Sequence, residues 1–171
     1  MTVGNKYLSL NNGQITQVAA TQISAGSTSG GQIVALNTAT GLIDISMMPV
    51  GIGPEADTLV ASETIAAGAF TNKWSNAGVI NVRNADATAN KPADGFVLAA
   101  YASGASATVF RLGQLNNSLT GMTIGSTEFL GTVGARTEIV PTGTGTISQI
   151  LGVAISATSM AFAPQPPITL A

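Results

Sequence analysis

The sequence predicts an all-β protein in which an extended N-terminal arm, residues 1–54, precedes a β-barrel or jelly-roll-like sandwich domain, residues 55–171. Two observations favour this class. Turn residues recur about every 8–12 positions between short segments rich in β-branched residues, which is typical of sandwiches and barrels. No segment long enough for a helix repeats its apolar residues with the helical period of about 3.6.

The arm begins with a predicted hairpin, because Asn12-Gly13 separates the alternating segments 7–11 and 14–18. Both central residues of such a turn need a positive φ, which Asn and Gly tolerate. This register places Leu10 opposite Ile15 and Tyr7 opposite Val18. Residues 24–31 have the composition of a flexible linker. Short extended segments are expected at 32–37 and 42–48, on either side of a turn at Thr40-Gly41, and breakers at 50–54 end the arm.

The domain that follows is expected to consist of short strands separated by turns. The segment nearest to a helix is 55–67, but its Gly and Thr content argues against one. The expected strands are 57–61, 70–75, 78–83, 95–102, 107–112, 128–131, 148–156 and 159–163.

Composition excludes much chemistry. The chain has no His and no Cys, and only 6 Lys and Arg with 8 Asp and Glu residues among 171. The usual general base and the usual thiol nucleophile are therefore missing. Charged residues make up only 8% of the chain, against about 25% in an ordinary soluble domain, so we expect other protein chains to cover much of its surface. An uncharged surface of Thr, Ser, Asn and Gln is the alternative.

Other function classes find little support. The basic residues are scattered, which does not favour nucleic-acid binding. The longest apolar run, 96–102, is far shorter than the ~20 residues of a membrane-spanning helix. The first 25 residues show no basic start followed by an apolar stretch, so no secretory signal is expected.

The candidate chemical sites are weak. Asp86 and Asp94 could form a catalytic pair, but their polar loop favours solvated carboxylates or an intersubunit salt bridge. The carboxylates of Glu55, Asp57 and Glu63 could bind calcium, but their spacing matches no calcium loop. Gly121, Gly125, Gly131 and Gly134 lack the Lys and the helix of a phosphate loop, which favours turns and bulges. Trp74 is expected to pack in the core or an interface rather than against a sugar. We therefore expect no enzymatic activity, no metal and no cofactor.

Four parts of the chain, at 31–49, 79–97, 119–131 and 149–162, carry short motifs in a fixed order. Taken together, these segments resemble those of tailed-bacteriophage capsid decoration (cement) and head-fibre proteins. Gly31–Pro49 is similar to a linker of that family, with Met47-Met48 where Leu is common. The stretches 79–97, 119–131 and 149–162 are similar to their "Val-Arg-x-Ala…Ala-Asp-Gly-Phe-Val", "Leu-Thr-Gly…Phe/Tyr-Leu" and "Gln-x-x-Gly-Val-Ala-x-Ser" segments. The resemblance implies a virion structural protein, usually a trimer with a β-barrel or jelly-roll-like fold.

We therefore expect a cement protein on the outer capsid surface that bridges neighbouring capsomers. Its expected partners are the major capsid protein and its own copies in a homotrimer, with no nucleic acid, membrane or small-molecule substrate. The capsid-contact candidates are Leu8, Leu10, Ile15 and Ile33. A head or tail fibre with a host-binding tip is the alternative. A glycan-binding or glycan-cleaving virion protein is a more distant one.

Overall fold

The computed structural model describes residues 5–39, 41–48 and 55–171. Its backbone contacts divide the chain into two compact units, Met1–Gly53 and Pro54–Ala171, called unit 1 and unit 2 below. The sequence places the boundary one residue later, between residues 54 and 55. No α-helix occurs in the described ranges and strands dominate both units, so the predicted all-β class is confirmed.

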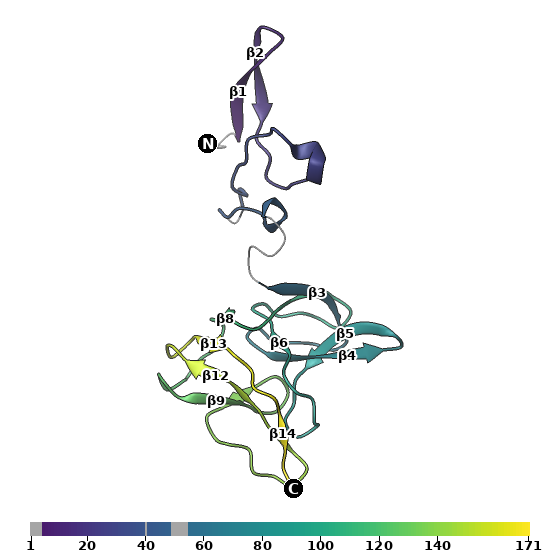
Figure 1. Cartoon of the computed structure of the whole chain (residues 1–171), viewed down its shortest axis with the longest axis vertical. Coiled ribbons are helices and arrows are strands. Elements are labelled where there is room, and N and C mark those ends of the chain that lie inside the picture. Colours follow the sequence, from purple (N-terminus) through teal and green to yellow (C-terminus); the bar gives the residue numbers. More distant parts are fainter. Residues whose placement is uncertain (1–4, 40, 49–54) are drawn as a thin grey trace. The chain divides into compact units, whose positions relative to one another are not determined.

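Strands β1 (Lys6–Asn11) and β2 (Gln14–Ala19) form the hairpin of unit 1 (Figure 1). Asn12 and Gly13 adopt φ values of 48° and 81°, as the turn requires. The predicted register is confirmed, because Leu10 pairs with Ile15 and Tyr7 pairs with Val18.

The rest of unit 1 is held by hydrogen bonds within loops and by a parallel bridge between Thr21 and Val34. The segment of linker composition, 24–31, contains a 3-10 helix, Gly26–Ser29, and a second 3-10 helix spans Ile45–Met47. Serine hydroxyls explain the first helix, since Ala25 N donates to Ser29 Oγ at 2.9 Å and so gains a local partner. Gly41 has a φ of 68°, while its expected turn partner Thr40 and the expected breakers at 50–54 lie outside the described residues.

Unit 2 contains the remaining strands. They are β3 (Ala56–Ala61), β4 (Phe70–Asn76), β5 (Val79–Asn84), β6 (Gly95–Phe96), β7 (Ser106–Phe110), β8 (Leu115–Asn116), β9 (Thr127–Leu130), β10 (Arg136–Thr137), β11 (Ile147–Ser148), β12 (Ile150–Ala154), β13 (Met160–Phe162) and β14 (Ile168–Thr169).

Strands β3 to β7 close into a barrel in the order β3-β5-β4-β6-β7. The β3–β5 pairing is parallel and the others are antiparallel. Aliphatic side chains form a core cluster of the barrel, including Ala61, Val82, Val97 and Val109. These side chains are small, as a barrel of few strands requires.

A second sheet lies beside the barrel, in the order β10-β9-β12-β13-β8, while β11 pairs with β14 (Figure 1). The larger core cluster combines residues of the barrel and of this sheet. At its centre the ring of Phe162 lies 5.7 Å from that of Phe70 and 5.4 Å from that of Phe96. Three phenylalanines from β4, β6 and β13 therefore join the two layers.

Two expected strands differ from the structure. Segment 95–102 is a strand only at Gly95–Phe96, because the chain then turns and forms a single bridge between Ile65 and Tyr101. Segment 148–156 is divided between β11 and β12, and the register of β12 on β9 shifts between Ile150 and Gly152. Gly152 has a φ of 149°, and a Cβ atom there would overlap the carbonyl oxygen of Ala161. This close approach explains why glycine occupies the bulge.

Candidate contact surfaces

The hairpin of unit 1 brings together three of the four capsid-contact candidates. Leu10 and Ile15 are direct cross-strand partners, and Leu8 lies on the same face two residues before Leu10. Their exposed fractions are 73% for Leu8, 72% for Leu10 and 74% for Ile15. Ile33 is 52% exposed but lies elsewhere, where its carbonyl accepts a 2.8 Å hydrogen bond from Thr21 N.

Among the residues of unit 1 whose burial the structure describes, 5–39, 41–44 and 46–48, none is buried. Both strands of its hairpin therefore offer their side chains to the surroundings. Its exposed large apolar side chains are Leu8, Leu10, Ile15, Val18, Ile23, Ile33, Val34, Leu36, Leu42, Ile43 and Met48. On the hairpin, Leu8, Leu10 and Ile15 lie together on one face, so their apolar side chains form one exposed group.

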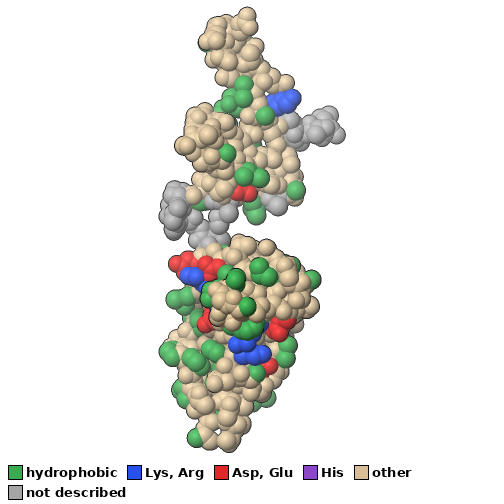
Figure 2. All heavy atoms as spheres, turned by 90° about the vertical axis from the view of Figure 1, so that its right-hand side faces the viewer, with side chains coloured by type: hydrophobic (Ala, Val, Ile, Leu, Met, Phe, Trp, Pro, Cys, Tyr) green, Lys and Arg blue, Asp and Glu red, His purple; other side chains and the backbone are tan. Residues whose placement is uncertain are grey.

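The second sheet of unit 2 has a buried inner face and an uncharged outer face. Alternation along the strands and the pairing register assign seven residues to the outer face: Leu115, Thr127, Phe129, Thr137, Ile150, Val153 and Ala161. Their neighbours along the strands, such as Leu130, Leu151 and Phe162, are fully buried. On the face drawn in Figure 2, charged side chains form a few small groups within a largely uncharged surface.

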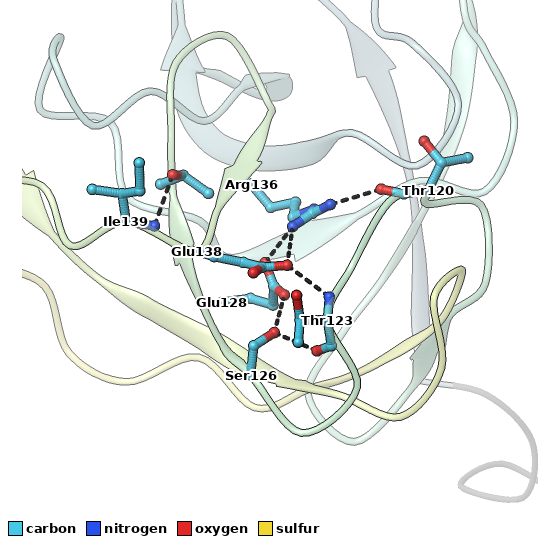
Figure 3. Close-up of polar contacts among 8 residues, drawn as sticks. Thr120, Thr123, Ser126, Glu128, Arg136, Glu138 and Ile139 are labelled. Carbon is cyan, nitrogen blue, oxygen red and sulfur yellow. Dashed lines mark hydrogen bonds and ion pairs between the residues drawn. The ribbon is translucent and has the colours of Figure 1, made fainter.

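The inner face of this sheet holds a buried ion pair (Figure 3). Glu128 is fully buried, and its Oε2 accepts a 3.0 Å hydrogen bond from Arg136 Nη1. Ser126 Oγ donates to the other carboxylate oxygen at 2.8 Å. The remaining donors of Arg136 reach Glu138 Oε1 at 3.1 Å and the Thr120 carbonyl at 2.7 Å. These partners satisfy the carboxylate and the guanidinium, so the group anchors loops rather than presenting a reactive atom.

Glu138 extends this group to the protein surface. Thr123 N donates to Glu138 Oε1 at 2.7 Å, and this backbone hydrogen bond, with Arg136 nearby, lowers the pKa of Glu138. The carboxylate is thereby kept ionised and holds the loop before β9 against the segment that follows β10.

A second charged group lies at one end of the barrel. Asp57 Oδ2 accepts hydrogen bonds from Lys73 Nζ at 2.5 Å and from Arg111 Nε at 2.7 Å. The hydrogen bond from Lys73, followed by that from Arg111, lowers the pKa of Asp57 below its usual value. These side chains border an open hollow together with Leu59 and Ile80.

The carboxylates considered as calcium ligands do not gather. Asp57 binds the two cations just described, whereas Glu63 Oε1 accepts hydrogen bonds from Asn84 N at 2.7 Å and Asn84 Nδ2 at 2.9 Å. Across residues 5–39, 41–48 and 55–171, no group of three or more His, Cys, Asp or Glu residues is arranged to hold a metal ion.

The carboxylates considered as a catalytic pair each support backbone. Asp86 Oδ1 accepts a hydrogen bond from Thr88 N at 2.9 Å, and Asp94 Oδ2 accepts one from Lys73 N at 2.9 Å.

Trp74 is half-buried, and its Nε1 donates a hydrogen bond to Ser62 Oγ at 3.0 Å. The guanidinium carbon of Arg83 lies 4.7 Å from the centroid of the Trp74 ring. One face of the indole is therefore occupied by a cation.

The glycines considered as a phosphate loop lie at turns and at a backbone bridge. Gly121, Gly125 and Gly134 have φ values of 67°, 82° and 74°, as turns require. Gly131 N donates to the Ala135 carbonyl at 2.9 Å instead.

No family model matches the chain, and no curated protein or solved structure matches it either. In the described ranges, no helix has the length and apolar character needed to cross a membrane. The function must therefore be inferred from the two apolar surfaces, of which sequence reasoning identified only the hairpin. Thr127 and Phe129 alternate with the buried Glu128 and Leu130, and this pattern is the sequence signal for the outer face. In β12 the bulge places Ile150 and Val153, three positions apart, on that same face, so simple alternation does not find them.

Proposed function

We propose that the protein is a structural component of a phage virion that decorates the outer capsid surface as a homotrimer. It stabilises the shell by bridging neighbouring capsomers, and unit 1 makes the contact with the major capsid protein. The observation that carries this proposal is that none of residues 5–39, 41–44 and 46–48 of unit 1 is buried, while many of them are apolar and lack a core to pack against.

The proposed mechanism is mechanical. Burying apolar surface contributes roughly 25 cal/mol per Å², so each arm adds attachment energy in proportion to the area that it covers. Three arms on one trimer bind neighbouring capsomers at once, and this multivalency converts weak contacts into firm attachment. A protein attached in this way opposes separation of the capsomers and needs no catalytic group.

The scarcity of charged residues in unit 1 leads to a specific expectation about salt. Lys6 and Asp44 are the charged residues of segment 1–54, and neither lies among the contact candidates. Attachment that relies on apolar contacts resists salt, because screening acts on charges. We expect binding to survive ~1 M salt, where the screening length is about 3 Å.

Reconstitution tests the proposal. Wild-type protein is added to expanded capsids that lack it, and bound copies are counted after washing. We expect hundreds of copies, an order-of-magnitude value for a site repeated over a symmetric shell. Removing residues 1–54 should abolish binding and leave the remaining trimer folded.

Two matched variants test the hairpin surface. Leu10→Asp places a charge on the face formed with Leu8 and Ile15 and should abolish attachment. Asn11→Asp adds the same charge on the opposite face of the hairpin and should bind at near wild-type copy number. Equal binding by both variants would argue against this face, and a dozen or fewer copies, or binding only at the tail, would replace the proposal with a fibre role.

A further inference from the structure

We infer that Asn12 is a site of spontaneous chemical modification, at which the backbone nitrogen of Gly13 displaces the side-chain amide and leaves aspartate and isoaspartate in place of asparagine. The site is the two-residue turn between β1 and β2, where Asn12 has a φ of 48° and Gly13 a φ of 81°. The reaction needs no partner and no catalyst, so it is independent of the proposed function.

Both reacting groups of this turn are accessible. Asn12 and Gly13 are exposed, and neither the Asn12 side chain nor the Gly13 nitrogen has a hydrogen-bond partner among the residues that the structure describes. Gly13 also lacks the Cβ atom that would crowd its approach to the Asn12 side chain. The two groups are neighbours in the chain, and an attack within one molecule is strongly favoured over attack by a separate one.

The hairpin does little to hold the turn in one conformation. No residue of β1 or β2 is buried. A two-stranded hairpin without a core beneath it is only marginally stable in water. The turn therefore opens and gives the Asn12 side chain access to the geometry in which the Gly13 nitrogen attacks.

The proposed reaction has two steps. The Gly13 nitrogen attacks Cγ of Asn12, a nitrogen–carbon bond forms, and the side-chain amino group leaves as ammonia with the proton lost from Gly13. Water then opens the resulting succinimide ring. Cleavage of the bond between the Gly13 nitrogen and Cγ gives aspartate, whereas cleavage of the bond between that nitrogen and the backbone carbonyl carbon gives isoaspartate. Nothing is oxidised or reduced, and the net change replaces an amide by an acid.

The modification changes both the charge and the backbone of the hairpin. Lys6 and Asp44 are the charged residues of segment 1–54, so a new carboxylate alters the charge of this segment substantially. Isoaspartate also routes the chain through the former side chain and lengthens the turn. Because the turn fixes the strand register, the pairing of Leu10 with Ile15 should be lost in the isoaspartate product.

The chain contains a matched internal control. Asn12 is the only asparagine in the sequence that is followed by glycine. Asn76 is also exposed and borders the two-residue turn between β4 and β5, but the residue after it is Ala77. The Cβ atom of Ala77 crowds the attacking nitrogen, so Asn76 should react more slowly.

Peptide mass spectrometry tests the inference. The purified full-length protein is kept in warm neutral buffer over several weeks, and fragment masses locate each conversion of an amide to an acid. Asn12 should be converted at least about tenfold faster than Asn76, and both aspartate and isoaspartate should accumulate at position 12. Asn12→Gly keeps a turn-forming pair and should show no product at this position. Conversion at equal rates, no conversion at Asn12, or aspartate without isoaspartate would overturn the inference.

Nuclear magnetic resonance tests the effect on the hairpin. Cross-strand contacts between Leu10 and Ile15 should weaken in aged wild type as isoaspartate accumulates, and they should persist in aged Asn12→Gly. Contacts that persist in both samples would refute the predicted change of register.

Discussion

Arg136 Nη1 lies 3.0 Å from Glu128 Oε2, and the Glu128 side chain has no exposed surface. Removing one partner of a buried pair leaves the other charge without compensation, which typically costs about 3–5 kcal/mol. Arg136→Met should therefore lower the free energy of unfolding by roughly this amount in urea titrations. Glu138→Gln is the control, because Glu138 is 30% exposed and its loss should cost less than about 1 kcal/mol. If both variants lost a similar amount of unfolding free energy, the buried ion pair would contribute no more to stability than the exposed one.

Asp57 makes stability depend on pH. Its pKa is lowered in the folded protein by hydrogen bonds from Lys73 and then Arg111, so its ionised form favours folding. This contribution is present above the unfolded pKa of about 3.9 and is lost as pH falls through the lower folded pKa. Asp57→Asn should flatten the decline in unfolding free energy between about pH 5 and pH 2.

Substitutions of Lys73 and Arg111 test which of the two side chains lowers the pKa of Asp57 more. Lys73→Met should flatten the acid decline more than Arg111→Met, because the hydrogen bond from Lys73 is the largest contribution. Urea titrations over the same pH series give the comparison. An acid profile that is identical in wild type and Asp57→Asn would rule out this origin.

Gly152 should tolerate no side chain. Its φ of 149° is rare for other residues, and a Cβ atom would overlap the Ala161 carbonyl on the neighbouring strand. Gly152→Ala should lower the free energy of unfolding by at least ~2 kcal/mol in thermal or urea unfolding. Gly125→Ala separates backbone strain from steric overlap. Gly125 has a φ of 82°, but a Cβ atom added there would have no other atom within 4 Å. It should cost about 1 kcal/mol, from backbone strain alone.

Thr71 contains an orphaned hydroxyl inside unit 2. Its Oγ1 is buried and has no hydrogen-bond partner, the one such side-chain atom found among the residues the structure describes. Thr71→Val keeps the shape and removes the unsatisfied group, so the unfolding free energy should rise by ~1–2 kcal/mol. Thr58→Val, at an exposed position of β3, should change it by less than about 0.5 kcal/mol. A loss of stability in Thr71→Val would indicate an unseen partner for this hydroxyl.

Local chemistry made part of this fold predictable. Asn12-Gly13 defined the first hairpin with its register, because a two-residue turn leaves no freedom in strand pairing. Alternating β-branched segments located most strands of unit 2 for the same local reason. In contrast, the parallel pairing of β3 with β5 and the closure of the barrel depend on contacts between distant segments, which no short window of sequence records.

The candidate surfaces, too, were predictable from the sequence only in part. The exposure of Leu8, Leu10 and Ile15 follows from a hairpin that has no core beneath it. The outer face escaped sequence reasoning, because the bulge at Gly152 changes which side of β12 each residue faces. The Glu128–Arg136 pair escaped it because β10, which brings Arg136 beside β9, has two residues and was not among the expected strands. The homotrimer, the capsid partner and the absence of catalysis remain predictions.

The closure of the barrel also constrains how the chain folds during synthesis. β3 needs β7 as a neighbour, and the contact between Asp57 and Arg111 spans 54 positions. At about 5–20 residues per second, the ribosome takes several seconds to supply β7 after β3 emerges. During this time the edge of β3 that β7 later covers is unpaired and can pair with other nascent chains. We therefore expect the yield of native protein to depend on translation speed and temperature more than on the stability of the finished fold.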